Sequence, residues 1–289
     1  MNRVFWNPIV KPTPLYFELL REFNCKKYND NLPLVSIVIP AYNSGKYIGE
    51  CLQSVINQTY TNWECFIVLA PCTDNTLDEI WKCINVDDPN PKIRIIREDK
   101  KSNCATARNK GFNECSGKYV TFLDADDWWE PQNLERMVMA MENYINSDLD
   151  WCVHCQKMHK DNKEQIIMEM PGTHNEIGGI GGILFKKETL DKIKSEYGYV
   201  FDESLKHTDD GDLSLRLRKY KGRLFPEVLS HYRWNESGLT ATTGNINQSW
   251  GIVKILIKRG AWDLLPYHLK NLGVCIVEEV TGFDLVRKR

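Results

Sequence analysis

Residues 119–127 read YVTFLDADD, and two patterns meet in this short stretch. Its first five residues are aromatic, aliphatic or β-branched and too few for a helix, which predicts a buried strand. Three aspartates follow at once: Asp124, Asp126 and Asp127. The stretch therefore predicts that a buried strand delivers three carboxylates to one end of a sheet.

Upstream of this stretch, predicted strands alternate with predicted helices. The strands are expected at Val35 to Ile39, Cys65 to Leu69 and Ile93 to Ile96, and the helices at 47–56, 77–84 and Asn103 to Cys115. Asp74 is the expected cap of the second helix. Alternation at this spacing favours parallel strands joined by helical crossovers, with both faces of the sheet covered. We predict an α/β fold with a doubly wound, mostly parallel sheet.

Downstream, the pattern becomes less regular. A helix is expected to open at Pro131, and beyond Asn146 the pattern predicts a mixed α+β half. Its expected parts are short strands at Asp150 to Cys155 and Gln165 to Met170, a glycine cluster at 178–182 and a helix at about 209–220. From Asn245 onward the apolar spacing is helical again, which predicts a helical tail packed on the main domain.

Composition limits the class of protein. The chain has 289 residues, of which 42% are hydrophobic and 26% charged, and this is typical of an ordinary globular protein of one large or two modest domains. A formal charge of −2 argues against nucleic acid as a partner. No apolar run approaches the roughly 18 residues of a membrane-spanning helix, although contact with a membrane surface stays open.

The N-terminal segment and the cysteines bear on the compartment. Pro8, Pro12 and Pro14 interrupt the N-terminal segment before a signal peptide could form. Ten cysteines, several inside apolar runs, are more typical of buried thiols than of disulfides. Both observations predict a cytoplasmic protein.

In parallel sheets ligands bind beyond the carboxyl ends of the strands. There the sequence has PAYN at 40–43, APCTDNT at 70–76 and DADD at 124–127. Like charges at this density require a cation, and hard oxygen ligands suit Mg²⁺ or Mn²⁺ with substrate phosphates completing the shell. The alternative is a solvated turn with a helix cap near Glu130.

Four segments together resemble the inverting family-2 glycosyltransferases of GT-A fold. They are VSIVIPAYNSGKYIGECLQSVINQTY, TDNT, ATARNKGFNECSGKYVTFLDADD and FDESLKHTDDGDLSLRL. The resemblance runs from about Leu34 to Thr240. It implies an N-terminal extension at 1–33, a catalytic domain at 34–240 with a nucleotide-sugar half (34–145) and an acceptor half (146–240), and a helical appendage at 241–289.

The resemblance also implies roles for particular residues. The nucleotide would be supported by the PAYN segment, which is Pro40, Ala41, Tyr42 and Asn43. Asp126 would be the direct metal ligand, Asp124 would lie near the ribose and the metal, and Arg108 would face the same cleft. The alternatives are a strand-ending turn for PAYN and a surface helix arginine for Arg108.

Asp210 matches the family's catalytic base, in the segment His207 to Leu213. A carboxylate opposite the diphosphate can take the proton from an acceptor hydroxyl as that hydroxyl attacks the anomeric carbon from the far face, so the configuration inverts. Such a base contributes on the order of 10²- to 10⁴-fold. The alternative is that Asp209 and Asp210 only cap a helix.

The chain departs from the family pattern at three places. Leu69 and Ala70 replace two aspartates after the second strand, so base recognition is expected to fall to stacking, to backbone groups around Ala41 and Cys72, or to Thr73. The late Tyr-Arg-x-His pattern ends in Asn235, with His231 a potential substitute or a structural histidine. Ser230 stands where processive members have glutamine, which favours the addition of one sugar per encounter.

The resemblance predicts a metal-dependent inverting transfer of one sugar from a nucleoside-diphosphate sugar to a carbohydrate or glycoconjugate acceptor. A uridine diphosphate sugar is the first expectation for the donor. One alternative is a nucleotide- or sugar-binding relative without turnover. Another is a nucleotidyltransferase, which would want a Gly-rich phosphate loop that PAYNSGK does not supply. The sequence assigns neither the sugar, the acceptor nor an oligomeric state.

One further motif, Cys152-x-x-Cys155 with His154 and His159 nearby, could suggest zinc. A structural zinc site usually has two such pairs, and the sequence offers no second one. We therefore expect a strand with buried thiols.

Overall fold

The structure is a computed structural model that describes residues 32–84, 91–143, 148–160, 163–167, 180–205, 207–235 and 245–281. The chain divides into two compact units, residues 1–33 and 34–289. The second unit carries the fold and the site described below.

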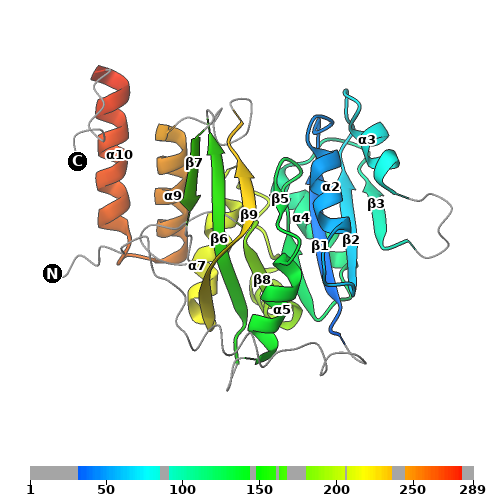
Figure 1. Cartoon of the computed structure of the whole chain (residues 1–289). Helices are drawn as coiled ribbons and strands as arrows, with labels where there is room; N and C mark the ends of the chain where they lie inside the picture. Colours follow the sequence, from blue (N-terminus) through cyan, green and yellow to red (C-terminus); the bar gives the residue numbers. More distant parts are fainter. Residues whose placement is uncertain are drawn as a thin grey trace. The chain divides into compact units, whose positions relative to one another are not determined.

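A single mixed sheet organises the second unit (Figure 1). Its strands are β1 (Val35–Ala41), β2 (Trp63–Leu69), β3 (Ile93–Arg97), β4 (Tyr119–Phe122), β5 (Trp128–Trp129), β6 (Trp151–Lys160), β7 (Lys163–Ile167), β8 (Ile183–Lys186) and β9 (Gly222–Arg233). They lie in the order β3-β2-β1-β4-β8-β6-β9-β5, with β7 paired to β6. The four strands from β3 to β4 are parallel, whereas β8 is antiparallel to both of its neighbours.

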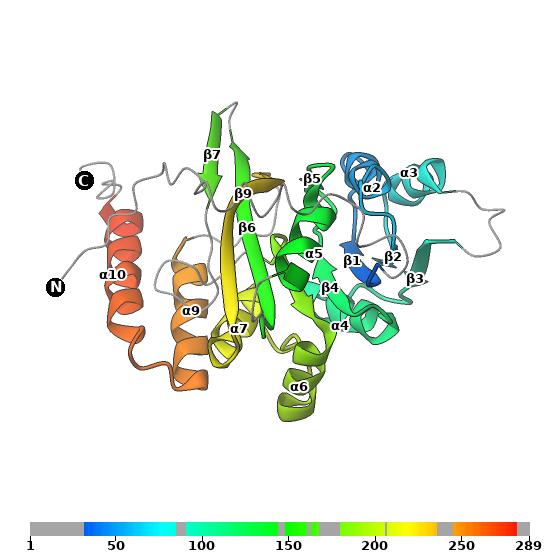
Figure 2. The same ribbon diagram turned by 60° about the horizontal axis from the view of Figure 1, so that its bottom comes forward.

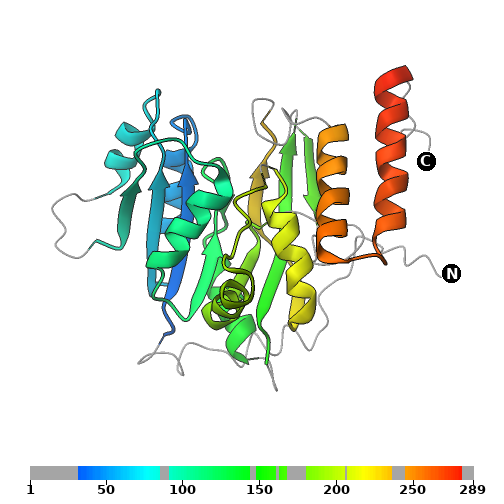
Figure 3. The same cartoon turned by 180° about the vertical axis from the view of Figure 1, so that it is seen from behind.

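Helices cover both faces of this sheet. They are α2 (Ile48–Ile56), α3 (Thr76–Cys83), α4 (Cys104–Glu114), α5 (Asn133–Asn143), α6 (Lys187–Tyr197), α7 (Asp209–Arg216), the 3₁₀ turn η1 (Leu217–Lys219), α9 (Asn245–Arg259) and α10 (Leu265–Thr281). Helices α2 and α5 lie in front of the sheet in Figure 1, and α4, α6 and α7 lie in front in the view from behind (Figure 3). The predicted α/β fold, with a parallel first half and a mixed second half, is confirmed.

The core lies where α4 and the following elements pack on the central strands. Gly111 of α4 approaches β1 so closely that a Cβ atom there would lie 2.3 Å from a methyl carbon of Val38. Phe122 at the end of β4 packs edge-to-face on Phe201, with ring centroids 4.9 Å apart. This packing fixes the position of the acidic segment that follows β4.

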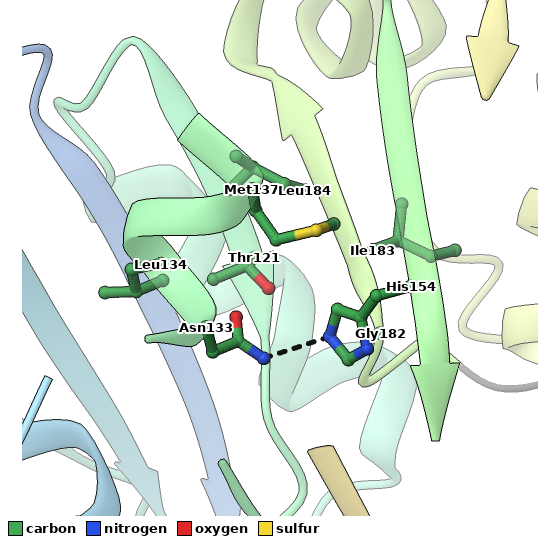
Figure 4. Close-up of a pocket in the computed structure, with 8 residues that line it drawn as sticks. All are labelled: Thr121, Asn133, Leu134, Met137, His154, Gly182, Ile183 and Leu184. Atoms are coloured by element: carbon green, nitrogen blue, oxygen red, sulfur yellow. Dashed lines mark hydrogen bonds between the residues drawn. The ribbon is translucent and has the colours of Figure 1, made fainter. Parts of the chain in front are cut away.

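A polar contact is buried where α5 packs on β6 (Figure 4). The Asn133 amide donates to the His154 Nε2 atom at 3.0 Å and to the Leu229 carbonyl at 2.8 Å. The His154 Nδ1 atom lies 2.8 Å from the carbonyl of Cys155, to which it donates. His154 is therefore a neutral structural residue, and Cys152 and Cys155 are buried thiols as predicted.

The helix boundaries differ from the predicted ones in detail. Helix α3 has Asn75 as its N-cap, while the Asp74 carboxylate accepts the Thr76 N–H at 3.1 Å from one position further out. The helix expected at Pro131 begins at Asn133, and the one expected at 209–220 ends at Arg216 and continues as η1.

The second half differs more from the prediction. The strand expected at 165–170 is β7 at Lys163–Ile167, and 168–170 lie outside the described residues. Strands β5, β8 and β9 and helix α6 were not predicted.

The predicted helical tail consists of two helices. Helix α9 packs against α7, and α10 packs against α9 (Figure 2). Gly260, with φ of 66°, ends α9 in the left-handed conformation that glycine adopts without strain. Among the described residues, no helix is both long and apolar enough to cross a bilayer.

Candidate functional site

Three predicted segments meet at one edge of the sheet. Strands β2, β1 and β4 are neighbours and run parallel, so the segments that follow Leu69, Ala41 and Phe122 leave the sheet side by side. This is the edge at which the sequence predicts a nucleotide site.

The segments after β1 and β2 are tied to each other. Asn43 has φ of 46°, a left-handed conformation that asparagine tolerates. Its side-chain carbonyl accepts the Thr73 N–H at 2.9 Å, and its amide donates to the Thr73 hydroxyl at 3.1 Å. The Asn43 N–H points to the Cys72 sulfur at 3.3 Å. Thr73, expected to recognise the base, thus fixes the shape of the segment after β1.

The remaining PAYN residues differ in exposure. Pro40 and Ala41 are the last residues of β1, and Ala41 accepts the N–H of Ala70 at 3.0 Å. The Tyr42 ring is 41% exposed, and the Lys101 ammonium lies 3.6 Å from its centroid. Tyr42 is therefore the exposed aromatic residue of the PAYN segment, with Lys101 beside its ring.

Leu69 and Ala70 are buried and supply no polar side chain to this edge. Glu98 directly follows the neighbouring strand β3, and its N–H donates to the Leu69 carbonyl at 2.9 Å. Its side chain is already bound by Lys110 at 2.5 Å and by the Ser102 hydroxyl. The Glu98 carboxylate is therefore already engaged by other side chains.

In the acidic segment after β4, burial and mutual repulsion raise the pKa values of two carboxylates. Burial, and then the charge of Asp124, raises the pKa of Asp126 to about 6. Burial also raises the pKa of Asp127 well above its ordinary value, although that carboxylate accepts the Arg233 N–H at 2.8 Å. A nearby cation would relieve this repulsion.

Arg108 lies between two acidic segments that are far apart in sequence. Its guanidinium binds Asp124 at 2.7 Å and Asp209 at 2.7 Å, and its side chain is only 5% exposed. The expected position beside the acidic segment is therefore observed, but as a buried bridge rather than as a surface residue. Asp209 is not the N-cap of α7, which is Thr208.

Asp210 is the second residue of α7, next to this bridge. Its carboxylate accepts the Gly211 N–H at 2.7 Å. Burial, and then the charge of Asp209, raises its pKa to about 6, while the charge of Arg108 lowers it. The structure thus gathers Asp124, Arg108, Asp209 and Asp210 in one electrostatic cluster.

A second group of residues surrounds the acidic segment, and sequence analysis singled out only one of them, His231. Arg233 donates from Nε to the Asp126 carbonyl at 3.0 Å and pairs with Glu50 at 2.5 Å. Its guanidinium also lies 4.5 Å from the centroid of the Trp128 ring. Arg233 therefore fixes the backbone of the candidate metal ligand.

His231 extends this group. Its ring stacks on Trp128 with centroids 4.7 Å apart and binds Glu130 at 2.8 Å and His159 at 2.9 Å. His231 is thus held by the segment after β5 and by β6. The pairing of β5 with β9 brings these residues together. The sequence signal that could have found them is the spacing of His231 and Arg233, because residues two apart on a strand share one face.

Residues 36–220 match the family model described as glycosyl transferase family 2. The chain belongs to glycosyl transferase family 2. An uncharacterized glycosyltransferase of Rickettsia typhi, RT0329, is 30% identical over 76% of this chain and 70% of that protein.

Other relatives share a shorter segment. The putative teichuronic acid biosynthesis glycosyltransferase TuaG of Bacillus subtilis is 37% identical over 38% of this chain and 42% of that protein. The Escherichia coli protein WfgD, named a UDP-Glc:alpha-D-GlcNAc-diphosphoundecaprenol beta-1,3-glucosyltransferase, is 34% identical over 39% of this chain and 43% of that protein. These matches span less than half of each relative.

Solved structures support the GT-A fold of this family-2 member. S. aureus TarS 1-349 in complex with UDP-GlcNAc has a TM-score of 0.63 and 18% identity, over 88% of this chain and 76% of that chain. The mannosyltransferase PcManGT of Pyrobaculum calidifontis, in complex with GDP-Man and Mn²⁺, has a TM-score of 0.62 and 17% identity, over 94% and 83%.

Proposed function

We propose that this family-2 glycosyltransferase moves one sugar from a nucleoside-diphosphate sugar to an acceptor hydroxyl, with inversion and with a divalent metal ion. One observation carries the proposal. The Arg108 guanidinium joins Asp124, at the end of β4, to Asp209, the neighbour of Asp210. The segment proposed to hold the donor and the helix that carries the candidate base thus share one buried positive charge.

Asp210 is the proposed general base. With a pKa of about 6 it is ionised at neutral pH and still basic enough to accept a proton. In the proposed step, the acceptor hydroxyl gives its proton to the Asp210 carboxylate, and its oxygen forms a bond to the anomeric carbon. The bond from that carbon to the diphosphate breaks, and nucleoside diphosphate leaves with the electron pair.

Asp126 and Asp124 fit a divalent cation. Both offer carboxylate oxygens, which suit Mn²⁺ or Mg²⁺, and the raised pKa of Asp126 indicates negative charge that lacks a partner. Within the described residues no group of three His, Cys, Asp or Glu side chains could hold a metal, so substrate phosphates would complete the shell. When bound, the ion would neutralise charge on the leaving diphosphate.

The donor nucleotide is proposed to lie on the loops after β1 and β2, with Tyr42 as the stacking surface. Structural neighbours were solved with UDP-GlcNAc and with GDP-Man, so the shared fold accepts more than one base. A UDP-sugar remains our first proposal for this chain.

The acceptor is proposed to be a carbohydrate or glycoconjugate held by the half beyond residue 146. The names of two relatives refer to glycan biosynthesis, teichuronic acid for TuaG and a GlcNAc-diphosphoundecaprenol acceptor for WfgD. We extend that role to this chain, with addition of one sugar per encounter. A cytoplasmic location is the sequence prediction that accompanies it.

A binding protein without turnover is the second candidate. Buried Leu69 and Ala70, where the family has aspartates, favour it because they remove a polar group from the nucleotide edge. The presence of both Asp210 and the carboxylates Asp124 and Asp126 argues against it, because a protein that only binds does not need a base.

A donor panel distinguishes the two candidates. The full chain would be incubated with Mn²⁺, sugars activated by UDP, GDP, CDP or dTDP, and a panel of saccharide acceptors, and released nucleoside diphosphate would be measured. Acceptor-dependent release, with a product whose anomeric configuration is inverted in its NMR spectrum, supports the enzyme. Nucleotide binding by calorimetry without any release supports the binding protein instead.

A further inference from the structure

Helix α9 packs directly on α7, the helix that carries Asp210, although α9 lies outside the segment 36–220 that matches the family (Figure 3). At Gly251 the two helices come so close that a Cβ atom there would lie 2.9 Å from the methyl carbon of Thr208. Thr208 is the N-cap of α7. The tail therefore touches the chain two positions before the candidate base.

Further along, Asp212 of α7 is held between two arginines. Its side chain is completely buried. Arg216, one turn later on the same helix, donates to it from Nε at 3.0 Å. Arg259, at the end of α9, donates to one carboxylate oxygen from Nε at 2.6 Å and to the other from Nη2 at 2.8 Å. Arg259 thus makes the two-point contact whose geometry suits a carboxylate best.

A second anchor lies beside the first. Lys258 of α9 forms an ion pair with Asp202, a buried residue in the segment between α6 and α7. Arg259 also donates to the Tyr199 hydroxyl at 3.2 Å. The last turn of α9 therefore holds both α7 and the chain that leads into it.

The packing matters because α7 is short. It has eight residues, and an isolated helix of that length is only marginally stable in water, so its packing partners must hold it in place. Arg216 belongs to α7 itself and also donates to the Val200 carbonyl at 2.5 Å, whereas Arg259 brings its charge to Asp212 from another helix. A catalytic group must be held within about 0.5 Å of its productive position.

We propose that Arg259 is a positioning residue for the candidate base: by binding Asp212 from the side of α9, it fixes the orientation of α7 and hence the place of the Asp210 carboxylate. This inference rests on the function proposed for Asp210. It makes residues 245–259 part of the catalytic unit and not a separate appendage.

Two substitutions and a matched control test the proposal. Arg259→Met keeps the length of the side chain and removes the contact, whereas Arg259→Lys keeps the charge without the planar fork. The control is Arg218→Met, because Arg218 makes an equally two-pronged contact, to Asp263 at 2.6 and 3.1 Å, at an exposed place beyond α7.

The first readout is hydrogen exchange on the full chain, which needs no substrate. In Arg259→Met we expect the backbone amides of residues 212–216 to exchange at least about tenfold faster, with those of β1 and β4 unchanged, because a locally loosened helix opens more often. Arg218→Met should leave both sets unchanged. Unchanged exchange of α7 in Arg259→Met would overturn the proposal.

The second readout separates chemistry from donor binding. A small displacement of the base should lower kcat by about 10- to 100-fold in Arg259→Met, and less in Arg259→Lys. Calorimetry with UDP and Mn²⁺ should give Kd values within about twofold of the unaltered chain. A parallel loss of UDP affinity, or an equal loss of kcat in Arg218→Met, would indicate general loosening and contradict a positioning role.

The Asp210→Asn variant shows whether a negative result contradicts this inference or the proposed function. Normal turnover in Asp210→Asn would remove Asp210 as the base, whatever Arg259 does. Loss of turnover in Asp210→Asn, with normal kcat in Arg259→Met, would keep the base and reject the role of Arg259.

Discussion

At the scale of single residues, Asp126 shows how burial prepares a ligand. The side chain is half-buried, and its pKa is raised by burial and by Asp124. A carboxylate in that state gains most from a divalent cation, since the cation offsets the cost of ionising it. We therefore propose Asp126 as the principal metal ligand.

Asp126→Ala should abolish the effect of Mn²⁺ on nucleotide affinity while the fold remains intact, because a polar loop residue contributes little to stability. Calorimetry with UDP, with and without Mn²⁺, measures the effect, and the exposed Asp78→Ala on α3 is the control. An Mn²⁺ effect in Asp126→Ala as large as in the control would show that another residue holds the metal.

Asp210 predicts the pH dependence of turnover. A base acts in its ionised form, and the raised pKa of about 6 means that protonation removes that form at a higher pH than for an ordinary aspartate. We expect kcat to be level above about pH 6 and to fall roughly tenfold per pH unit below it. A profile that stays level to pH 4.5 would contradict this assignment.

The matching substitution is Asp210→Asn, which should lower kcat by about 10²-fold or more and leave the Kd of UDP unchanged. Asp191→Asn, an exposed residue of α6 that pairs with Lys187, is the control. Equal activity of the two variants would return Asp210 to a purely structural role.

Sequence motifs located one part of the site and not the other. Asp124, Arg108 and Asp210 lie in segments with strong local patterns, and the structure brings them together. Arg233 and Trp128 were missed, and the role of His231 was left open, because their contacts depend on the pairing of β5 with β9 across about 100 residues. Nothing local to a two-residue strand reveals its partner.

At the scale of elements, local periodicity predicted the regular half. Strands β1 and β2 are short, mostly apolar and followed by amphipathic helices, so their pattern is unambiguous. Strand β9 has no such pattern, because Pro226 interrupts it and its burial follows no period of two. Helix α6 did carry a signal, with Leu190 and Ile193 buried at helical spacing and Gly198 at its C-terminal end.

The contact between α5 and β6 gives a prediction for stability. Burial lowers the pKa of His154 from 6.5 to about 4. Protonation would also place an N–H at Nε2 opposite the Asn133 amide, which donates to that atom. The unfolded chain binds this proton near pH 6.5, so the contribution of His154 to stability is complete above 6.5 and is lost as pH falls toward 4.

The predicted loss reaches on the order of 3 kcal/mol at pH 4, at about 1.4 kcal/mol per pH unit. Urea unfolding of the full chain at pH 7, 6, 5 and 4 measures it. His154→Gln should be less stable at pH 7 and should lose less between pH 6.5 and 4, whereas the exposed His207→Gln should follow the unaltered chain. Parallel curves for all three proteins would contradict the prediction.

At the scale of the whole molecule, the order of the strands decides which loops meet. The sequence predicted that parallel strands share one ligand edge, but it could not place β8 between β4 and β6 or bring β9 back beside β5. The positions of β8 and β9 depend on pairing between residues far apart in sequence, which local periodicity does not reveal. They also bring Arg259 of the tail to the helix of the candidate base.

The last prediction concerns the donor base and follows from the edge that these loops build. A site that pairs with the polar atoms of a base rejects other bases, because its own buried groups would be left unpaired. Here Leu69 and Ala70 are buried and apolar, Glu98 is already bound by Lys110, and Thr73 is engaged by Asn43. The ring of Tyr42 and the backbone groups around Ala41 and Cys72 remain for the base, and stacking on an aromatic face favours no particular base.

We therefore expect weaker discrimination between bases than in relatives that keep the aspartates. Competition binding of UDP, GDP, CDP and dTDP at fixed Mn²⁺ measures it, and UDP should lead by well under 10³-fold. Ala70→Asp restores a carboxylate at the edge of the nucleotide loop and should widen the preference, because an ionised acceptor favours a base with a ring N–H. A preference for UDP beyond about 10³-fold in the unaltered chain, about 4 kcal/mol, would mean that a polar group outside this edge recognises the base.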